Sequence, residues 1–258
     1  MKIHTLLIVV TLFLYNIAFP QSTEFLSIVV SKKVINISGI TLTTIPMHGP
    51  YMVAGNKFLS LEEDAEMSDI VFPDSMIVDD IFWTGNDFVV KSGFGLYSIG
   101  NLDEPLMDFD TWDYSIFPWD SKRLFVVYTL GDTSRLFLAN IVAKRAKRLL
   151  TIGEKIVYVA ASDKSTMLVT TENIYIFNGQ DCKRYLDLWS PLRTAVMTKF
   201  GLVFATDNEI CLLTGVNEFL LLFEGTCERV LYDGQYLFLQ LADGDLLKCN
   251  LNAFLKKS

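Results

Sequence analysis

Residue types that could perform histidine-based catalysis are scarce in this sequence. It has two histidines, His4 and His48, and His48 lies in the segment PMHGPY, whose composition is typical of a turn between two strands. A Ser-His-Asp triad would have to use His48, and no G-x-S-x-G segment supplies a nucleophile elbow. Walker, Rossmann and EF-hand patterns are absent as well. We therefore predict no catalytic residue and no cofactor.

Carboxylates are the remaining chemically active groups. They gather in two clusters, one of Glu62, Glu63, Asp64, Glu66 and Asp69, the other of Asp103, Glu104, Asp108, Asp110 and Asp113. Hard oxygen ligands of this kind can hold calcium, and a general acid–base pair would need a pocket that spacing alone does not show. A solvated acidic face explains both clusters equally well, so we predict no metal site.

The four cysteines, Cys182, Cys211, Cys227 and Cys249, all lie in the last third of the chain. Four cysteines allow three disulfide pairings, and sequence does not choose among them. No C-x-x-C motif occurs, and Cys211 and Cys249 lie in apolar segments, where buried thiols are common. We expect reduced, buried cysteines.

The charge balance is acidic. Lys and Arg number 22 against 30 Asp and Glu, and without Lys2 of the predicted leader the net charge is 21 − 30 = −9. Nucleic-acid binding depends on neutralising phosphates with Lys and Arg, so we exclude nucleic acid as a partner. The one basic cluster, Lys144–Arg148, is expected to be a charged edge strand, which discourages the addition of further strands.

Residues 1–20 have the layout of a secretory signal peptide. Lys2 supplies a basic start, residues 6–19 form an apolar run, and a polar segment begins at Gln21. Later in the chain no apolar run approaches the roughly 18 residues of a membrane span. Cleavage after Ala18 or near Gln21 would leave a mature domain of residues 21–258, secreted or periplasmic. An uncleaved anchor helix is the alternative.

An internal repeat organises the rest of the chain. Six segments share the pattern of an apolar strand, a tight polar turn and a second apolar strand, and the first apolar residues after these turns are Phe58, Leu96, Leu136, Ile174, Ile210 and Leu246. Each hairpin follows another short strand, and five of the six units add a fourth, more charged strand. Four antiparallel strands repeated at a nearly constant period are typical of β-propeller blades.

In period and strand pattern, residues 24–252 resemble six-bladed propellers of the TolB-like and NHL-like kind. The resemblance implies an all-β fold, a single six-bladed β-propeller of four-stranded antiparallel blades. The last unit has only three strands, whereas the segment EFLSIVVSKKVINIS near the start has no hairpin partner. We predict that residues 25–30 pair with residues 246–251 as the outer strand of that blade, which closes the ring and removes a sheet edge.

Propellers usually bind ligands at the mouth of the central channel, where the innermost strands begin. The residues at these predicted strand entries have mixed charge and include Asp79, Asp80, Asp113, Glu154, Lys155, Arg193, Glu228 and Arg229. We select Asp79, Asp80, Asp113, Glu154, Arg193 and Glu228 as candidate ligand-binding residues, suited to a polar or zwitterionic ligand or a peptide loop. Charge that merely keeps strand ends soluble is the alternative for each of them.

Together these patterns favour an exported, non-catalytic propeller that acts as a binding or scaffold module in a bacterial envelope or the extracellular space. Its partner would be a protein, a glycan or another polar small molecule. Two alternatives remain at this point. One is a carboxylate- or metal-dependent hydrolase or lyase acting at the channel, and the other is an accessory subunit of a surface polysaccharide, secretion or adhesion system.

Overall fold

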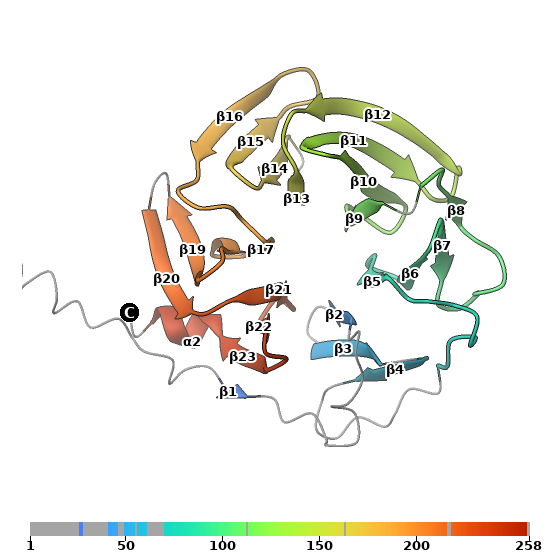
Figure 1. The fold of residues 1–258 in the computed structure, drawn as a ribbon, viewed down its shortest axis with the longest axis horizontal. Helices are drawn as coiled ribbons and strands as arrows, with labels where there is room; N and C mark the ends of the chain where they lie inside the picture. The colour runs from blue at the N-terminus through green and yellow to red at the C-terminus, as the bar shows by residue number, and fades with distance from the viewer. Residues whose placement is uncertain are drawn as a thin grey trace, which may run out of the picture.

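The computed structural model describes residues 26–27, 41–45, 49–54, 56–60, 70–111, 113–162, 164–215 and 218–256. The predicted signal peptide, His48 and the carboxylate cluster of residues 62–69 lie outside these ranges. The described residues form antiparallel sheets arranged in a ring, with one short helix, α2 (Leu251–Leu255), beside the last sheet (Figure 1). No helix in the described part of the chain is long and apolar enough to cross a membrane.

Three sheets are built from four consecutive strands in the middle of the chain. The first contains β5 (Asp80–Trp83), β6 (Phe88–Ser92), β7 (Gly95–Ser98) and β8 (Met107–Asp108). The second contains β9 (Tyr114–Pro118), β10 (Arg123–Leu130), β11 (Thr133–Asn140) and β12 (Arg145–Ile152), and the third β13 (Ile156–Ala161), β14 (Thr166–Thr170), β15 (Asn173–Phe177) and β16 (Cys182–Asp187).

A fourth such sheet contains β17 (Thr194–Thr198), β18 (Gly201–Ala205), β19 (Glu209–Gly215) and β20 (Glu218–Glu224). The last sheet combines β21 (Cys227–Tyr232), β22 (Tyr236–Leu241) and β23 (Leu246–Asn250) with β1 (Leu26–Ser27) from the start of the chain. β2 (Thr41–Ile45), β3 (Gly49–Ala54) and β4 (Lys57–Ser60) form a three-stranded sheet. The chain is thus a β-propeller, and the prediction of four-stranded antiparallel blades is confirmed.

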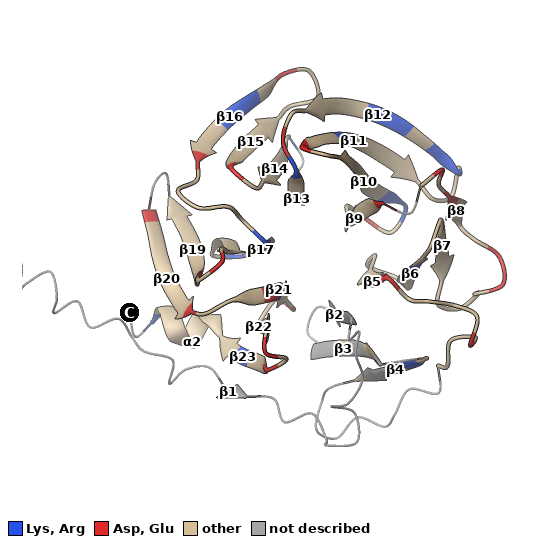
Figure 2. Cartoon of the chain, in the orientation of Figure 1, with Lys and Arg blue, Asp and Glu red and all other residues tan. Residues whose placement is uncertain are grey.

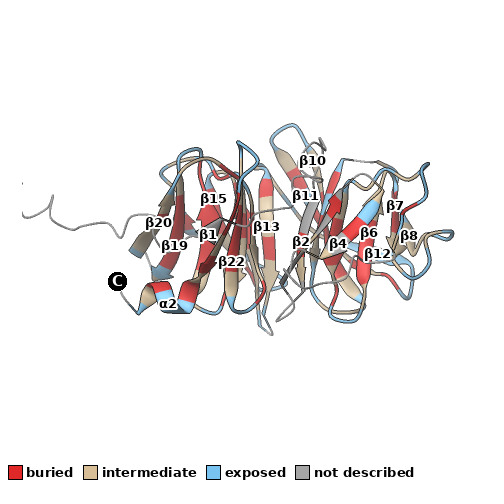
Figure 3. Cartoon of the chain, turned by 90° about the horizontal axis from the view of Figure 1, so that it is seen from below, coloured by how far each residue is buried: buried red, intermediate tan, exposed pale blue. Residues whose placement is uncertain are grey.

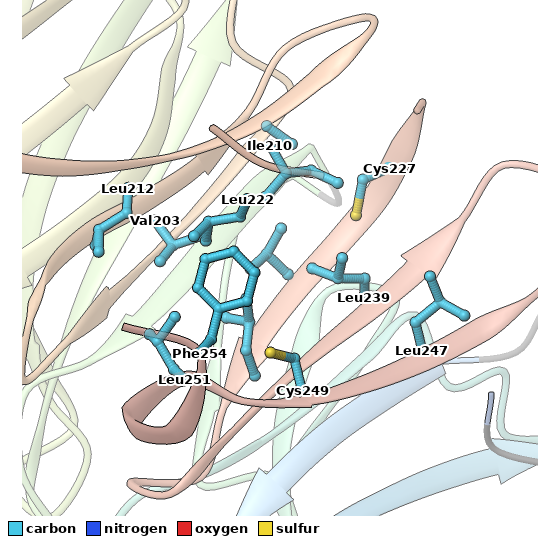
Figure 4. Packing of buried hydrophobic residues seen from close by; sticks show 13 residues of the cluster. Val203, Ile210, Leu212, Leu222, Cys227, Leu239, Leu247, Cys249, Leu251 and Phe254 are labelled. Atoms are coloured by element: carbon cyan, nitrogen blue, oxygen red, sulfur yellow. The ribbon is translucent and has the colours of Figure 1, made fainter. Parts of the chain in front are cut away.

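The hydrophobic core lies between neighbouring sheets, as a propeller requires. All six repeat positions predicted from the sequence, Phe58, Leu96, Leu136, Ile174, Ile210 and Leu246, are buried on the third strand of their sheets. In the largest cluster, Val203 and Leu212 from one sheet pack with Leu237 and Leu239 from the next (Figure 4). Buried residues run along the strands, and exposed residues concentrate in the turns at the two faces of the ring (Figure 3).

The predicted count of six four-stranded blades is not matched, because five sheets of the described chain have four strands and the β2-β3-β4 sheet has three. In the β2-β3-β4 sheet the chain returns beside β4 only briefly, where the amide of Phe58 donates to the carbonyl of Ile70 and that of Phe72 to Asn56. Beyond Phe72 the returning chain has passed Lys57, the first residue of β4, so β4 offers it no further partner, and the amide of Met76 donates to the carbonyl of Pro73 to close a turn. The residues before Ile70 lie outside the described ranges, and within those ranges the returning chain pairs with β4 through the single bridge of Lys57 and Val71.

The predicted clasp between the two ends of the chain has a partial counterpart. β1 pairs antiparallel with β23 through Leu26 opposite Lys248 and Ser27 opposite Leu247. Within the described residues, Thr44 Oγ1 of the β2-β3-β4 sheet donates a 3.3 Å hydrogen bond to the carbonyl oxygen of Tyr232 in the last sheet. The five apolar clusters of the described chain all join other pairs of neighbouring sheets. Full closure of the ring stays a prediction.

Candidate functional site

The candidate site is one face of the ring, which we call the entry face. It is the face at which the innermost strands β5, β9, β13, β17 and β21 begin (Figure 1). Because strands alternate in direction within each sheet, the turns β6–β7, β10–β11, β14–β15, β18–β19 and β22–β23 lie on the same face. All six candidate ligand-binding residues stand at the entry face, as their positions before the innermost strands require.

Asp79 and Asp80 have structural partners at the start of β5. The Asp79 carboxylate accepts a 2.8 Å hydrogen bond from the amide of Gly93 and so closes the β6–β7 turn, where Gly93 has a left-handed φ of 55°. The Asp80 carboxylate accepts from its neighbour's amide at Ile81 and forms a 2.5 Å ion pair with Arg229 of β21. This pair links sheets that flank β2 in the ring.

Glu154 is held by a network within the third sheet. Its carboxylate accepts hydrogen bonds from Thr170 Oγ1, from Asn173 Nδ2 at 2.9 Å and from the Tyr175 hydroxyl at 2.5 Å. Burial by itself would raise the pKa of Glu154, but the three donors outweigh it and lower that pKa below its usual value. Burial and the bond to Glu154 raise the pKa of Tyr175 to about 12, so the hydroxyl keeps its proton.

Replacing Glu154 with glutamine should lower the melting temperature by about 2–6 °C at pH 7, because charge-assisted bonds worth roughly 1–2 kcal/mol are weakened. The folded-state pKa of Glu154 is depressed, so its ionisation stabilises the fold above the unfolded pKa of about 4.3. That contribution disappears as the pH falls through the lower, folded-state value. Thermal melts of both proteins from pH 7 down to pH 3 should therefore converge.

The matched control for this prediction is Glu228→Gln, which removes an exposed carboxylate from the same face. Its melting curve should coincide with that of the wild type at every pH. A Glu154→Gln deficit that stays constant from pH 7 to pH 3 would show that the network does not depend on the charge.

The other three candidates are more exposed. Arg193 Nε donates to Asp207 in the neighbouring β18–β19 turn at 2.5 Å. Asp113 and Glu228 are exposed at the starts of β9 and β21. No hydrogen bond or ion pair within the described ranges joins any two of the six candidates. The structure therefore places them on one face without assembling them into a single pocket.

The turns that carry this face have a recurrent local cause. While its one proton is donated to Glu154, Thr170 Oγ1 accepts from the amide of Asn173 at 2.9 Å, so the side chain closes the β14–β15 turn. Thr206 does the same with Glu209 one sheet later. Threonine followed three residues later by a strand start is a local signal of such turns. It positions the charged residues between the two strands at the face.

The entry face is strongly acidic. Its turns and strand ends carry Asp74, Asp79, Asp80, Asp108, Asp110, Asp113, Asp132, Glu154, Glu172, Asp187, Asp207, Glu209, Glu224, Glu228, Asp243 and Asp245, against Lys57, Lys91, Lys155, Arg193 and Arg229. On the opposite face, acidic residues (Asp87, Asp103, Glu104, Asp120, Asp181, Glu218, Asp233) and basic residues (Lys122, Arg123, Lys144, Arg145, Lys164, Lys183, Lys199, Lys256) are nearly balanced. The two faces therefore differ in charge.

Large apolar side chains are also concentrated on the entry face. Five of the eight exposed large apolar residues in the described chain belong to it, namely Val71, Ile77, Phe94, Leu130 and Trp189. Ile77 is 75% exposed before β5, and Leu130 is 78% exposed at the β10–β11 turn. These residues were not predicted, because the sequence around an apolar residue at a strand end does not reveal whether a neighbouring sheet covers it.

A hollow opens on this face beside the third and fourth sheets. It has a volume of about 440 Å³, and its lining includes Asn173 and Glu172 from the β14–β15 turn, Arg184 and Asp187 from β16, and Trp189 from the crossover to β17. None of these residues was selected from the sequence. The signal that could have found the hollow is the segment LWSP, in which the apolar residues Leu188 and Trp189 stand in a loop where polar residues are the rule.

Other groups singled out in the sequence can be located in the structure. Among the described residues no group of three or more His, Cys, Asp or Glu side chains could hold a metal ion. The basic cluster lies on β12 except for Lys144, which precedes the strand, and β12 is the outermost strand of its sheet, so the predicted edge strand is confirmed (Figure 2). Cys211, Cys227 and Cys249 are buried and Cys182 is exposed. Burial raises the pKa of Cys211 and of Cys227 to about 12, which keeps both as unreactive thiols.

No protein-family model and no curated protein sequence matches this chain. Its fold resembles that of regucalcin, a calcium-binding protein from Agrobacterium tumefaciens str. C58, with 11% identity and a TM-score of 0.61 over 83% of this chain and 90% of that one. It also resembles the extracellular domain of a one component system from B. thetaiotaomicron, with 15% identity and a TM-score of 0.55 over 77% of this chain and 31% of that one. The computationally designed Ika8 protein is similar as well (11% identity, TM-score 0.51, 83% and 71% covered). At such identities the likeness shows the propeller fold alone.

Proposed function

We propose that this chain is an exported, non-catalytic binding module that recognises a protein partner through the entry face of its propeller. The observation that carries this proposal is the placement of most exposed large apolar side chains on that one face. Such residues are ordinary when scattered singly, whereas their concentration on one face is typical of an interaction surface. The contact region we assign consists of Ile77, Phe94 and Leu130, at the β4–β5, β6–β7 and β10–β11 connections.

The state of the charged residues supports binding over catalysis. Asp79, Asp80, Glu154 and Arg193 already have hydrogen-bond or ion-pair partners within the fold. A general acid or base must instead be poised toward a substrate, with a pKa near the working pH. The pKa of Glu154 is instead lowered, which takes it further from a neutral working pH.

The acidic entry face indicates the chemistry of the partner. Its carboxylates would attract a protein surface with apolar residues surrounded by Lys or Arg, since complementary charge steers association and selects partners. The attraction should weaken as salt rises, because the Debye length shortens from about 10 Å at 0.1 M to about 3 Å at 1 M. We therefore propose a partner with a basic contact surface.

The test is capture and reconstitution of a partner with matched surface variants. Wild-type protein, the double variant Ile77→Glu/Leu130→Glu and the control Val142→Glu would each be used to isolate partners from the native source. Val142 is 71% exposed but lies on the opposite face. A partner purified in this way should bind the wild type and the control equally, and the double variant at least about tenfold more weakly.

Equal binding by all three proteins would overturn the assignment of the surface. Turnover on a panel of hydrolase and lyase substrates that is abolished by changing Asp80 or Asp113 would overturn the non-catalytic function. A chelator that lowers the melting temperature would show a bound metal and would favour the metal-dependent alternative.

We further propose that the β2-β3-β4 sheet is a sixth blade and that the strand β1 closes the ring. The pairing of β1 with β23 and the return of residues 70–72 beside β4 support this arrangement. A protein of residues 39–258 should then melt clearly below one of residues 21–258, because it would expose an unpaired edge at β23. Circular dichroism melts of the two proteins test this, and coincident melts would refute closure by this segment.

Export remains a proposal that rests on residues 1–20. Expression of the full-length chain in a secreting host should yield a mature protein that begins between residues 19 and 22. Intact-mass measurement reads the cleavage site directly. A retained leader would favour the anchor-helix alternative.

A further inference from the structure

A second surface lies further along the ring from the proposed protein contact, at the hollow beside Trp189. The side chain of Trp189 is 53% exposed, although tryptophan has one of the largest apolar surfaces of any residue. It belongs to the crossover from β16 to β17, between the third and fourth sheets. A ligand that covers the indole would remove apolar surface from water at a site where the fold itself does not.

Trp189 is held in place despite this exposure. Its ring makes T-shaped contacts with Phe219, at 4.3 Å between centroids, and with Phe204, at 5.7 Å. Phe204 is fully buried, so it anchors the indole to the core. The crossover is fixed as well, because the amide of Leu188 donates to the carbonyl of Glu172 at 2.8 Å and that of Leu192 donates to Thr171 at 2.9 Å. The indole is therefore an ordered platform.

The other half-exposed tryptophan provides a useful contrast. Trp119, 36% exposed, stacks on Phe125 at 5.4 Å with an interplanar angle of 9°. The guanidinium of Arg123 lies 3.8 Å from the centre of the same ring. Both contacts are of the stacked kind that covers an aromatic face. For Trp189, no stacked ring or cation occurs among the described residues.

Polar groups of both charges and of neutral character surround the platform. Arg184 and Asp187 form a 3.0 Å ion pair at the wall, and Glu172 and Ser190 also line the hollow. Asn173 lines the hollow as well, and its side-chain amide donates to Glu154. These groups present donors and acceptors around one apolar plane. The volume of about 440 Å³ is within the range of roughly 300–1,000 Å³ found for small-molecule sites.

We propose that this hollow binds a neutral saccharide, with one sugar ring stacked on Trp189. A sugar ring has an apolar face of C–H groups and a periphery of hydroxyls that both donate and accept, which matches an indole surrounded by an amide, a carboxylate and a guanidinium. Glu172 and Asp187 disfavour phosphates and other anionic ligands, because like charges repel at close range. The acidic character of the whole entry face also disfavours anionic ligands.

The test is a titration of the folded protein with defined oligosaccharides. Maltohexaose, cellohexaose, xylohexaose, mannohexaose and chitohexaose serve as neutral probes, and a hexamer of galacturonic acid serves as the anionic probe. Isothermal titration and tryptophan fluorescence should show at least one neutral probe binding in the micromolar to millimolar range. Trp189→Ala should weaken that binding by at least about tenfold, whereas Trp119→Ala should leave it unchanged.

A second variant keeps the test valid if Trp189→Ala disturbs the fold. Glu172→Gln changes an exposed side chain and should weaken binding of the neutral probe several-fold without altering the melting temperature. Failure of every neutral probe to bind at 10 mM, preference for the anionic probe, or equal losses in the two tryptophan variants would each overturn the proposal. Trp189→Ala should also retain the protein partner, and Ile77→Glu/Leu130→Glu should retain the saccharide, so the two proposals fail separately.

Discussion

Replacing Gly201 with alanine should lower the melting temperature by about 8–16 °C, equivalent to roughly 4 kcal/mol of unfolding free energy. Gly201 begins β18 with a φ of 135°, a conformation that residues with a side chain rarely adopt. A Cβ atom added there would lie 2.1 Å from the carbonyl oxygen of Leu213 on the neighbouring strand β19. The two strands would have to separate, which would disturb buried side chains such as Leu202 and Leu213.

The matched control is Gly131→Ala in the β10–β11 turn. Gly131 also has a positive φ, of 59°, but a Cβ atom there meets nothing within 4 Å. Its replacement should cost only the backbone preference, about 1–2 kcal/mol. Thermal and urea unfolding of both variants would separate steric conflict from backbone strain. Equal losses of stability would contradict the close approach of β18 and β19 at Gly201.

Replacing Phe254 with alanine should destabilise the protein by about 3–5 kcal/mol, the usual cost of removing a buried aromatic ring. Phe254 lies on the short helix α2 and is 1% exposed. Figure 4 shows its ring among side chains of two sheets, with Val203 and Leu222 on one side and Leu239 on the other. The helix thus closes the end of the largest apolar cluster.

The control for this change is Asn252→Ala on the exposed side of the same helix. It should alter the unfolding free energy by no more than about 0.5 kcal/mol. Urea unfolding measures both variants under one condition. If Phe254→Ala lowers the unfolding free energy no more than the control does, α2 contributes little to the core.

Two surfaces of the entry face thus have separate proposed roles. The apolar residues Ile77, Phe94 and Leu130 lie on connections around the first and second four-stranded sheets, whereas the Trp189 hollow lies between the third and fourth. A propeller offers such independence because each sheet supplies its own turns to the common face. One module could therefore hold a protein and a saccharide together.

The sequence period predicted the strands well for a physical reason. An innermost or middle blade strand is buried on both sides by neighbouring sheets, so it must be almost continuously apolar. Leu124–Val127 on β10 is an example, and each of its four residues is at most 1% exposed. The tight polar turns between such strands, as at Asp243–Asp245, fix where each hairpin reverses.

The blade count and the last helix were harder to predict. Within the described residues the chain that returns beside β4 pairs through a single bridge, Lys57 with Val71, and a count of apolar segments does not register how short such a pairing is. Helix α2 has five residues, too few for a periodic pattern, and it forms because Leu251 and Phe254 reach a core that only the assembled sheets provide. Its N-cap, Asn250, accepts from the amide of Ala253 at 3.1 Å.

By itself the sequence determined the all-β repeat, the six buried anchor positions, the charged outer edge at β12 and the face on which the candidate residues stand. These properties follow from patterns within one blade, where neighbours in space are also near in sequence. Only the tertiary structure decided that Asp80 pairs with Arg229, that Glu154 is held by three donors and that Trp189 stays exposed over a hollow. Pairing and exposure between sheets depend on contacts far apart in the chain, and no local pattern encodes them.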